Sequence, residues 1–210
     1  MSLDFNDGER QRGGDVIPNG TLVRAIGVIR PGGVSRPGQE KVDGGYLTAS
    51  KSSDVLYLSW EFTVVDGPFA RRKFWQNMTV SGGEVNERGE SKAWNITKTS
   101  MRAMLCSARN VKPDDMSENA TAARRINAWA DLDGVEFAAK VGISKGNNGY
   151  PDRNQIAAVI EPGHKDYTVI MSGEGGGPVA ASAPAPQAAW AKPATAATET
   201  MKVPAEVCVL

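Results

Sequence analysis

Residues 56–80 hold two alternating runs of apolar and polar residues that are joined by a turn. In the first run, every second residue from Leu56 to Val64 is apolar, which is the period of a strand with one buried face. An Asp-Gly-Pro turn at 66–68 separates this run from a second one, predicted at 71–80, that keeps a similar alternation. The segment therefore predicts a β-ribbon with one face in a hydrophobic core.

The outward face of this ribbon combines cations with aromatic rings. Arg71, Lys73 and Trp75 have the outward phase of the second strand, and Tyr57 has the outward phase of the first. Arg72 has the opposite phase but lies close enough to the turn to reach the rim. A single strand of nucleic acid offers bases that stack on rings and phosphates that attract cations, so the ribbon predicts a nucleic-acid-binding surface. The alternatives are a tryptophan that covers the core from outside and an ordinary solvated charged face.

The predicted elements follow one another as three strands, a helix and two strands. The strands are predicted at 20–30, 56–64, 71–80, 135–144 and 154–161, and the helix at 93–109. A short helix that is capped by Asp114 or Ser117 and runs through Ile126 and Trp129 is predicted before the fourth strand. Five short strands with one helix between the third and the fourth are typical of a mainly β, five-stranded OB-fold barrel. An unrelated small β-sandwich with an incidental helix is the alternative.

Further candidate residues lie on the neighbouring strands and loops. Oligonucleotides on an OB-fold are usually held by the loops after the first and the fourth strands. The residues that could extend the binding surface into these regions are Arg24, Arg30, Lys51, Lys145, Tyr150 and Arg153.

Composition divides the chain into four parts. Residues 1–18 are polar and predict a flexible arm, and residues 19–171 form the predicted OB-fold domain. Residues 172–200 are rich in Gly, Ala and Pro, so they bury too little apolar area to offset the entropy of ordering and predict a disordered linker. The closing peptide 201–210 regains Val and Leu, which predicts a short docking peptide. A terminus without a role is the alternative.

Charge favours a basic surface only locally. The whole chain has 24 Lys and Arg against 24 Asp and Glu, so no global charge argument for nucleic acid exists. Between residues 20 and 112, however, fourteen basic residues stand against eight acidic ones, an excess of six. This distribution favours a basic patch on the predicted OB-fold domain.

Catalysis needs a constellation of residues that the sequence does not offer. His164 is the only histidine, and no phosphate-binding G-x-x-x-x-G-K-[ST] motif occurs. Acid pairs at 114–115 and at 131 and 133 could hold the metal of a nuclease, but such pairs more often begin helices or turns. The sequence therefore predicts no enzyme, no metal site and no cofactor.

The cysteines and the hydropathy predict the compartment. Cys106 and Cys208 are too few and too differently placed for a disulfide framework, which indicates a reducing environment. The N-terminal residues contain no apolar run of the kind that a signal peptide needs, so we expect no signal peptide. No stretch of the sequence approaches the eighteen or so apolar residues that span a bilayer. We therefore expect a cytoplasmic protein without a membrane partner, and a homo-oligomer is compatible with this interpretation.

The segment 48–80, the following helix and the strand pair around 135–160 together resemble a family of bacteriophage and prophage single-stranded-DNA-binding proteins with an OB-fold. The similarity covers about residues 18–162. Members carry a lysine before the second strand, an acid-Gly-Pro turn and a strand with arginine and aromatic residues. The matching positions here are Lys51, Asp66, Gly67, Pro68, Arg71, Arg72, Phe74 and Trp75. The resemblance implies binding of single-stranded DNA during replication or recombination, in the cytoplasm of a bacterial host.

The C-terminal peptide departs from what bacterial single-strand binders often carry. Their flexible linker often ends in an acidic tip that recruits other proteins, whereas this chain closes with Glu206 against Lys202 and an apolar end.

Two functions from other classes stay open beside single-strand binding. One is a virion or assembly protein whose β-barrel makes only protein contacts, and the other is a metal-dependent nuclease or recombination enzyme.

Overall fold

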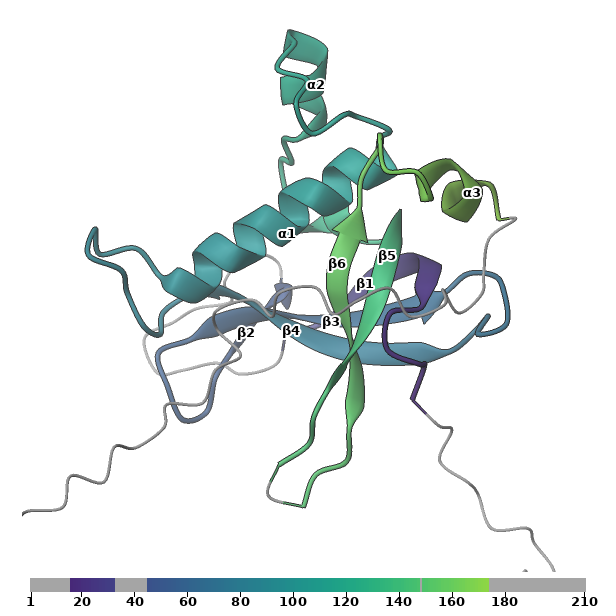
Figure 1. The fold of residues 1–210 in the computed structure, drawn as a ribbon. Coiled ribbons are helices and arrows are strands. Elements are labelled where there is room, and N and C mark those ends of the chain that lie inside the picture. Colours follow the sequence, from purple (N-terminus) through teal and green to yellow (C-terminus); the bar gives the residue numbers. More distant parts are fainter. Residues whose placement is uncertain (1–15, 33–44, 148, 174–210) are drawn as a thin grey trace, which may run out of the picture. The chain divides into compact units, whose positions relative to one another are not determined.

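A computed structural model describes residues 16–32, 45–147 and 149–173 of the chain (Figure 1). Most of the predicted N-terminal arm lies outside these described residues, and so do nearly all of the predicted linker 172–200 and the whole peptide 201–210. Residues 33–44 also lie outside them.

The described part of the chain is mainly β, as the sequence predicts, with one six-stranded antiparallel sheet and three α-helices. The strands are β1 (Leu22–Arg30), β2 (Leu47–Ala49), β3 (Leu56–Val64), β4 (Lys73–Ser81), β5 (Val135–Ser144) and β6 (Arg153–Ile160). The helices are α1 (Lys92–Ala108), α2 (Glu118–Ala123) and α3 (Tyr167–Ser172), with a short 3₁₀ helix, η2, at Trp129–Leu132. Strand β2 and helix α3 were not predicted, and β4 begins two residues later than expected.

The pairing of strands runs outward from β3. Strand β3 pairs with β4 along one edge. Along its other edge, the first residues of β3 pair with β2 and the later residues pair with β1. Strand β1 also pairs with β5, and β5 pairs with β6. No hydrogen-bonded ladder joins β4 to β6 among the described residues, so the sheet is not closed. We call the gap between β4 and β6 the seam.

A side chain bridges the seam where the backbone does not. The amide oxygen of Gln76 on β4 accepts a hydrogen bond of 2.9 Å from the backbone N–H of Ile156 on β6. Helix α1 contacts β4, β5 and β6 and so covers one end of the seam, as Figure 1 shows. Its Ser91 cap accepts from the N–H of Trp94, and its apolar residues Met101 and Met104 enter the core.

The core is built around the inward residues of β3. Trp60 stacks on Phe62 with ring centroids 5.4 Å apart, and Phe137 of β5 meets Phe62 edge-on at 5.8 Å. Gly27 of β1 lies beneath Trp60, where an added Cβ would come within 2.7 Å of the indole ring. A glycine at this position is therefore what allows the large ring to lie against the sheet.

Helix α3 covers one end of the outer face of the sheet. Helix α3 packs Tyr167 and Ile170 against Leu22, Ala138 and Ile160. The hydroxyl of the buried Tyr167 donates to the backbone carbonyl of Ser107 at 2.6 Å, and burial raises its pKa above the ordinary value. Elsewhere on this face, Trp75 is half-exposed among the described residues.

A buried asparagine anchors the chain before β1 to the β5–β6 pair. Asn154 is 7% exposed, and its side chain both accepts from the N–H of Ile17 and donates to the carbonyl of Ile17, each at 2.8 Å. It also donates to the carbonyl of Gly142 at 3.3 Å. These three contacts fix residues 16–18 beside the start of β6.

Replacing Asn154 with alanine should destabilise the fold by about 3 kcal/mol, because three hydrogen bonds of about 1 kcal/mol each are lost around buried groups. Urea unfolding followed by tryptophan fluorescence measures the free energy of unfolding. Asn77→Ala, on the exposed face of β4, is the matched control and should change it by less than about 0.5 kcal/mol. Equal effects of the two substitutions would contradict this role for Asn154.

Candidate nucleic-acid interface

The β3–β4 ribbon presents the predicted outward residues on one face. Trp75 lies directly opposite Glu61 of β3, and its side chain is 50% exposed. Tyr57 faces the same side but lies opposite Thr79. Four residues of strand separate Tyr57 from Glu61, or about 13 Å, so Tyr57 is not a direct neighbour of Trp75. The two rings therefore do not form one continuous platform.

Glu61 joins the two central groups of this face. Its carboxylate accepts a hydrogen bond from the ammonium of Lys73 and another, of 3.0 Å, from the indole N–H of Trp75. The hydrogen bonds from Lys73 and then Trp75 hold the pKa of Glu61 below its ordinary value. Lys73 is consequently neutralised by a neighbouring acid, which charge counting along the sequence did not show.

The turn before β4 changes the phase of the two arginines. The carbonyl of Val64 accepts a hydrogen bond from the N–H of Arg71, and the N–H of Val64 donates to the carbonyl of Arg72. Arg71 and Arg72 thus lie opposite the single residue Val64, which is the arrangement of a β-bulge. Arg71 has a φ of 66°, in the left-handed region, as the first residue of such a bulge often does. The direction of the Arg71 side chain therefore does not follow from strand alternation. Arg71 is also not among the residues that line the hollow described next.

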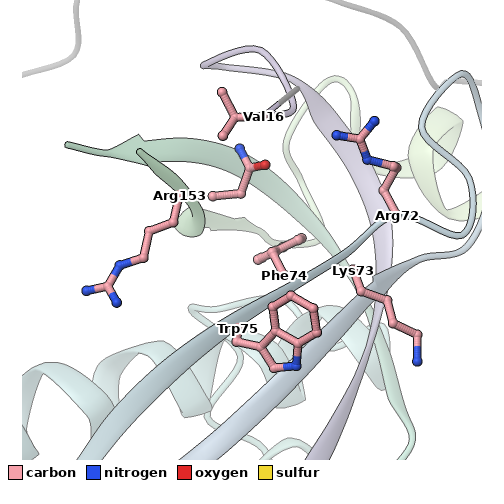
Figure 2. A pocket seen from close by; sticks show the side chains of 7 residues that line it. Val16, Arg72, Lys73, Phe74, Trp75 and Arg153 are labelled. Atoms are coloured by element: carbon pink, nitrogen blue, oxygen red, sulfur yellow. The ribbon is translucent and has the colours of Figure 1, made fainter. Parts of the chain in front are cut away.

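A hollow of about 580 Å³ opens at the end of the seam away from α1, where β4 and β6 begin (Figure 2). Figure 2 shows the side chain of Arg72 extending toward Val16, and that of Lys73 extending in the opposite direction. The hollow is lined by Val16, Arg72, Lys73, Phe74, Trp75, Arg153 and Asn154. The structure thus brings together four predicted site residues, Arg72, Lys73, Trp75 and Arg153, from two strands far apart in the sequence.

Two arginines of the hollow keep their charge unpaired. No acidic side chain within the described part of the chain forms an ion pair with Arg72 or Arg153. Arg153 is exposed and Arg72 is half-buried. Because they approach the hollow from opposite strands, they flank it with positive charge.

Two of the predicted cations serve the fold instead. Arg24 forms an ion pair of 2.8 Å with Asp66 and lies 3.8 Å from Glu136. Lys145 pairs with Asp152 at 2.6 Å, and Asp152 also accepts from the N–H of Gly146. The two hydrogen bonds to Asp152, from Lys145 and then from Gly146, brace the β5–β6 loop and hold the pKa of Asp152 below its ordinary value.

The remaining predicted residues lie at the margins of the hollow or away from it. Arg30 ends β1 on the outer face, opposite Ser59, and is exposed. Lys51 is exposed in the connection between β2 and β3. Tyr150 is 76% exposed in the loop of the β5–β6 hairpin, which extends beyond the sheet in Figure 1.

The acid pairs have structural partners. A carboxylate oxygen of Asp131 accepts from the N–H groups of Asn127 and Ala128, and Asp133 accepts from the N–H of Ile29 at 2.7 Å. Asp115 accepts from the N–H of Ser117, just before α2. Within residues 16–32, 45–147 and 149–173, no three His, Cys, Asp or Glu side chains are grouped to hold a metal ion.

Three arginines in or after α1 also form hydrogen bonds within the fold. Arg102 donates to the carbonyl of Pro113, and Arg109 donates to carbonyls at 123 and 125. Arg124 donates to three carbonyls between 112 and 115. These contacts hold the segment around α2 against the end of α1, so the charges do not extend the β3–β4 surface.

Sequence reasoning missed two contributors to this interface. Alternation placed Glu61 outward, but nothing in the sequence paired it with Lys73. Val28 of β1, opposite Glu61 on the other side, is 41% exposed and adds apolar surface to the same row. The outward phase of β1 is the signal that could have identified Val28.

The acid stability of the fold should depend on Glu61. In the unfolded chain Glu61 takes up a proton near pH 4.5, whereas its pKa is lower in the folded chain. The stabilisation is therefore complete above about pH 4.5 and is lost as the pH falls through the folded pKa. The unfolding free energies of the wild type and Glu61→Gln should converge below that pH. A difference that stays constant from pH 7 to about pH 3 would contradict this, and Lys73→Met should reduce the pH dependence as well.

No helix in the described ranges is both long and apolar enough to cross a membrane. No protein-family model matches the chain, and no curated protein matches it either. The described residues of the hollow thus combine the exposed indole ring of Trp75 with two arginines, Arg72 and Arg153, that have no acidic partner among the described residues.

Proposed function

We propose that this protein binds single-stranded DNA without sequence preference. The observation that carries the proposal is the hollow at the seam, where the half-exposed ring of Trp75 lies with Arg72 and Arg153, which form no ion pair with any described residue. An exposed ring is a stacking platform for any base, because every base has a flat face. Cations on both sides of it supply the contacts that phosphates need.

We further propose that the sheet is a variant of the OB-fold barrel. Without β2, the strands pair in the order β4-β3-β1-β5-β6. Along the chain, α1 lies between β4 and β5, which are then the third and the fourth strands of the sequence. At the seam β4 and β6 run in the same direction, since their first residues share the hollow and Gln76 meets Ile156 farther along. A barrel of this type binds oligonucleotides on the face of its second and third strands, which here are β3 and β4.

The biological setting follows from the same proposal. Single-strand binding of this kind serves replication or recombination of phage or prophage DNA in the cytoplasm of a bacterial host, without catalysis or a cofactor. Residues 172–200 act as a linker in this proposal, and the peptide 201–210 docks on replication or recombination proteins. The support for these assignments is the composition of the sequence and its resemblance to the phage family.

Binding of a labelled oligothymidine at low and moderate salt tests the function directly. Two phosphate contacts, at Arg72 and Arg153, should weaken binding about sevenfold between 50 and 200 mM salt, because each contributes a slope of about −0.7. Duplex DNA should bind more weakly, and single strands incubated with magnesium or manganese should stay intact. An assembly protein would bind little at either salt concentration, and cleaved strands would indicate a nuclease.

Trp75→Ala should weaken single-strand binding by about 1–3 kcal/mol, because a stacked base loses its platform. Trp75→Phe keeps an aromatic ring and should recover part of the loss. Met116→Ala removes a side chain that is 77% exposed on the loop before α2, so it is the control and should bind like the wild type. Wild-type affinity of a folded Trp75→Ala protein would reject the stacking role.

A further inference from the structure

Glu61 lies at the centre of the open outer face. Its neighbours across the sheet are Val28 of β1 on one side and Trp75 of β4 on the other. Its side chain is 22% exposed, so the carboxylate is accessible to a ligand on this face. A surface built only to attract phosphates would not place an anion there.

The carboxylate occupies the two donors that a phosphate would otherwise use. One oxygen accepts from the ammonium of Lys73, and the other accepts from the indole N–H of Trp75 at 3.0 Å. The ring face of Trp75 stays exposed, because the hydrogen bond uses only the edge of the indole. Glu61 thus blocks anions beside the ring and leaves the stacking surface free.

The net positive charge of the site lies elsewhere. Lys73 and Glu61 together are neutral, whereas Arg72 and Arg153 have no acidic partner among the residues described by the structure. The attraction for phosphates is therefore concentrated at the hollow between β4 and β6. The apolar and stacking surface lies on the row that runs from Trp75 to Val28.

We propose that Glu61 separates the base path from the phosphate path of a bound single strand. Bases lie over Trp75 and toward Val28, and phosphates follow Arg72 and Arg153 across the hollow. Glu61 is a positioning residue in this arrangement: it orients the indole, holds Lys73 and repels phosphates from the ring. The inference rests on the proposed single-strand binding and assigns the two components of the strand to separate residues.

A double-mutant cycle with Glu61→Gln and Lys73→Met tests this assignment through the salt dependence of oligothymidine binding. In the wild type, Lys73→Met should hardly change the salt slope, because Glu61 already neutralises Lys73. Glu61→Gln should make the slope steeper by about 0.7, since the freed ammonium gains a phosphate. The double variant should return to the wild-type slope. Arg72→Met and Arg153→Met should each make the slope shallower by about 0.7.

Glu136→Gln is the matched control, because Glu136 faces the outer side from β5 as Glu61 does from β3, but it lies 3.8 Å from Arg24 and does not contact Lys73. It should leave the slope unchanged. Two results would overturn the inference while single-strand binding stands. One is a salt slope that becomes shallower by about 0.7 in Lys73→Met alone, and the other is an unchanged salt slope in Glu61→Gln. Absence of any salt-dependent binding by the wild-type chain would overturn the proposed function and this inference together.

Discussion

The alternation of β3 is the constraint on which both the core and the candidate interface depend. Its inward residues Leu58, Trp60 and Phe62 are at most 1% exposed, and its outward residue Glu61 holds Lys73 and Trp75. A shift of one residue in register would exchange the two faces, so the rings would enter solvent and the carboxylate would enter the core. Packing on one side of the strand therefore fixes the geometry of the interface on the other side.

Local patterns were sufficient to predict most of the elements. The alternation at 56–64, the apolar run at 135–144 and the stripe of α1 each depend on neighbours within one element, and the structure places a strand or helix at all three. Ser117 caps α2 as its residue type predicts. Helix α3 was missed because it has only six residues, and its stability comes from packing on the outer face of the sheet.

The charges of the candidate interface could not be assigned in the same way. Lys73 is neutralised by Glu61, twelve residues away, and Arg24 by Asp66, forty-two residues away. Charge counting treats all these arginines and lysines alike, whereas strand register decides which of them meet an acid. The left-handed bulge at Arg71 is a further example, because it interrupts the alternation from which its direction was predicted.

The incomplete seam has a consequence for how copies of this protein behave together. Within the described residues, β4 pairs only with β3 and β6 pairs only with β5, so each has an edge on which an extended strand from another molecule could add. Charged side chains at such edges discourage this addition, since a stacked neighbour would bring like charges together. Lys73 and Arg153 begin these two strands. Lys73 is paired with Glu61, whereas Arg153 has no acidic partner among the described residues, so Arg153 is the residue whose charge disfavours strand addition at this edge.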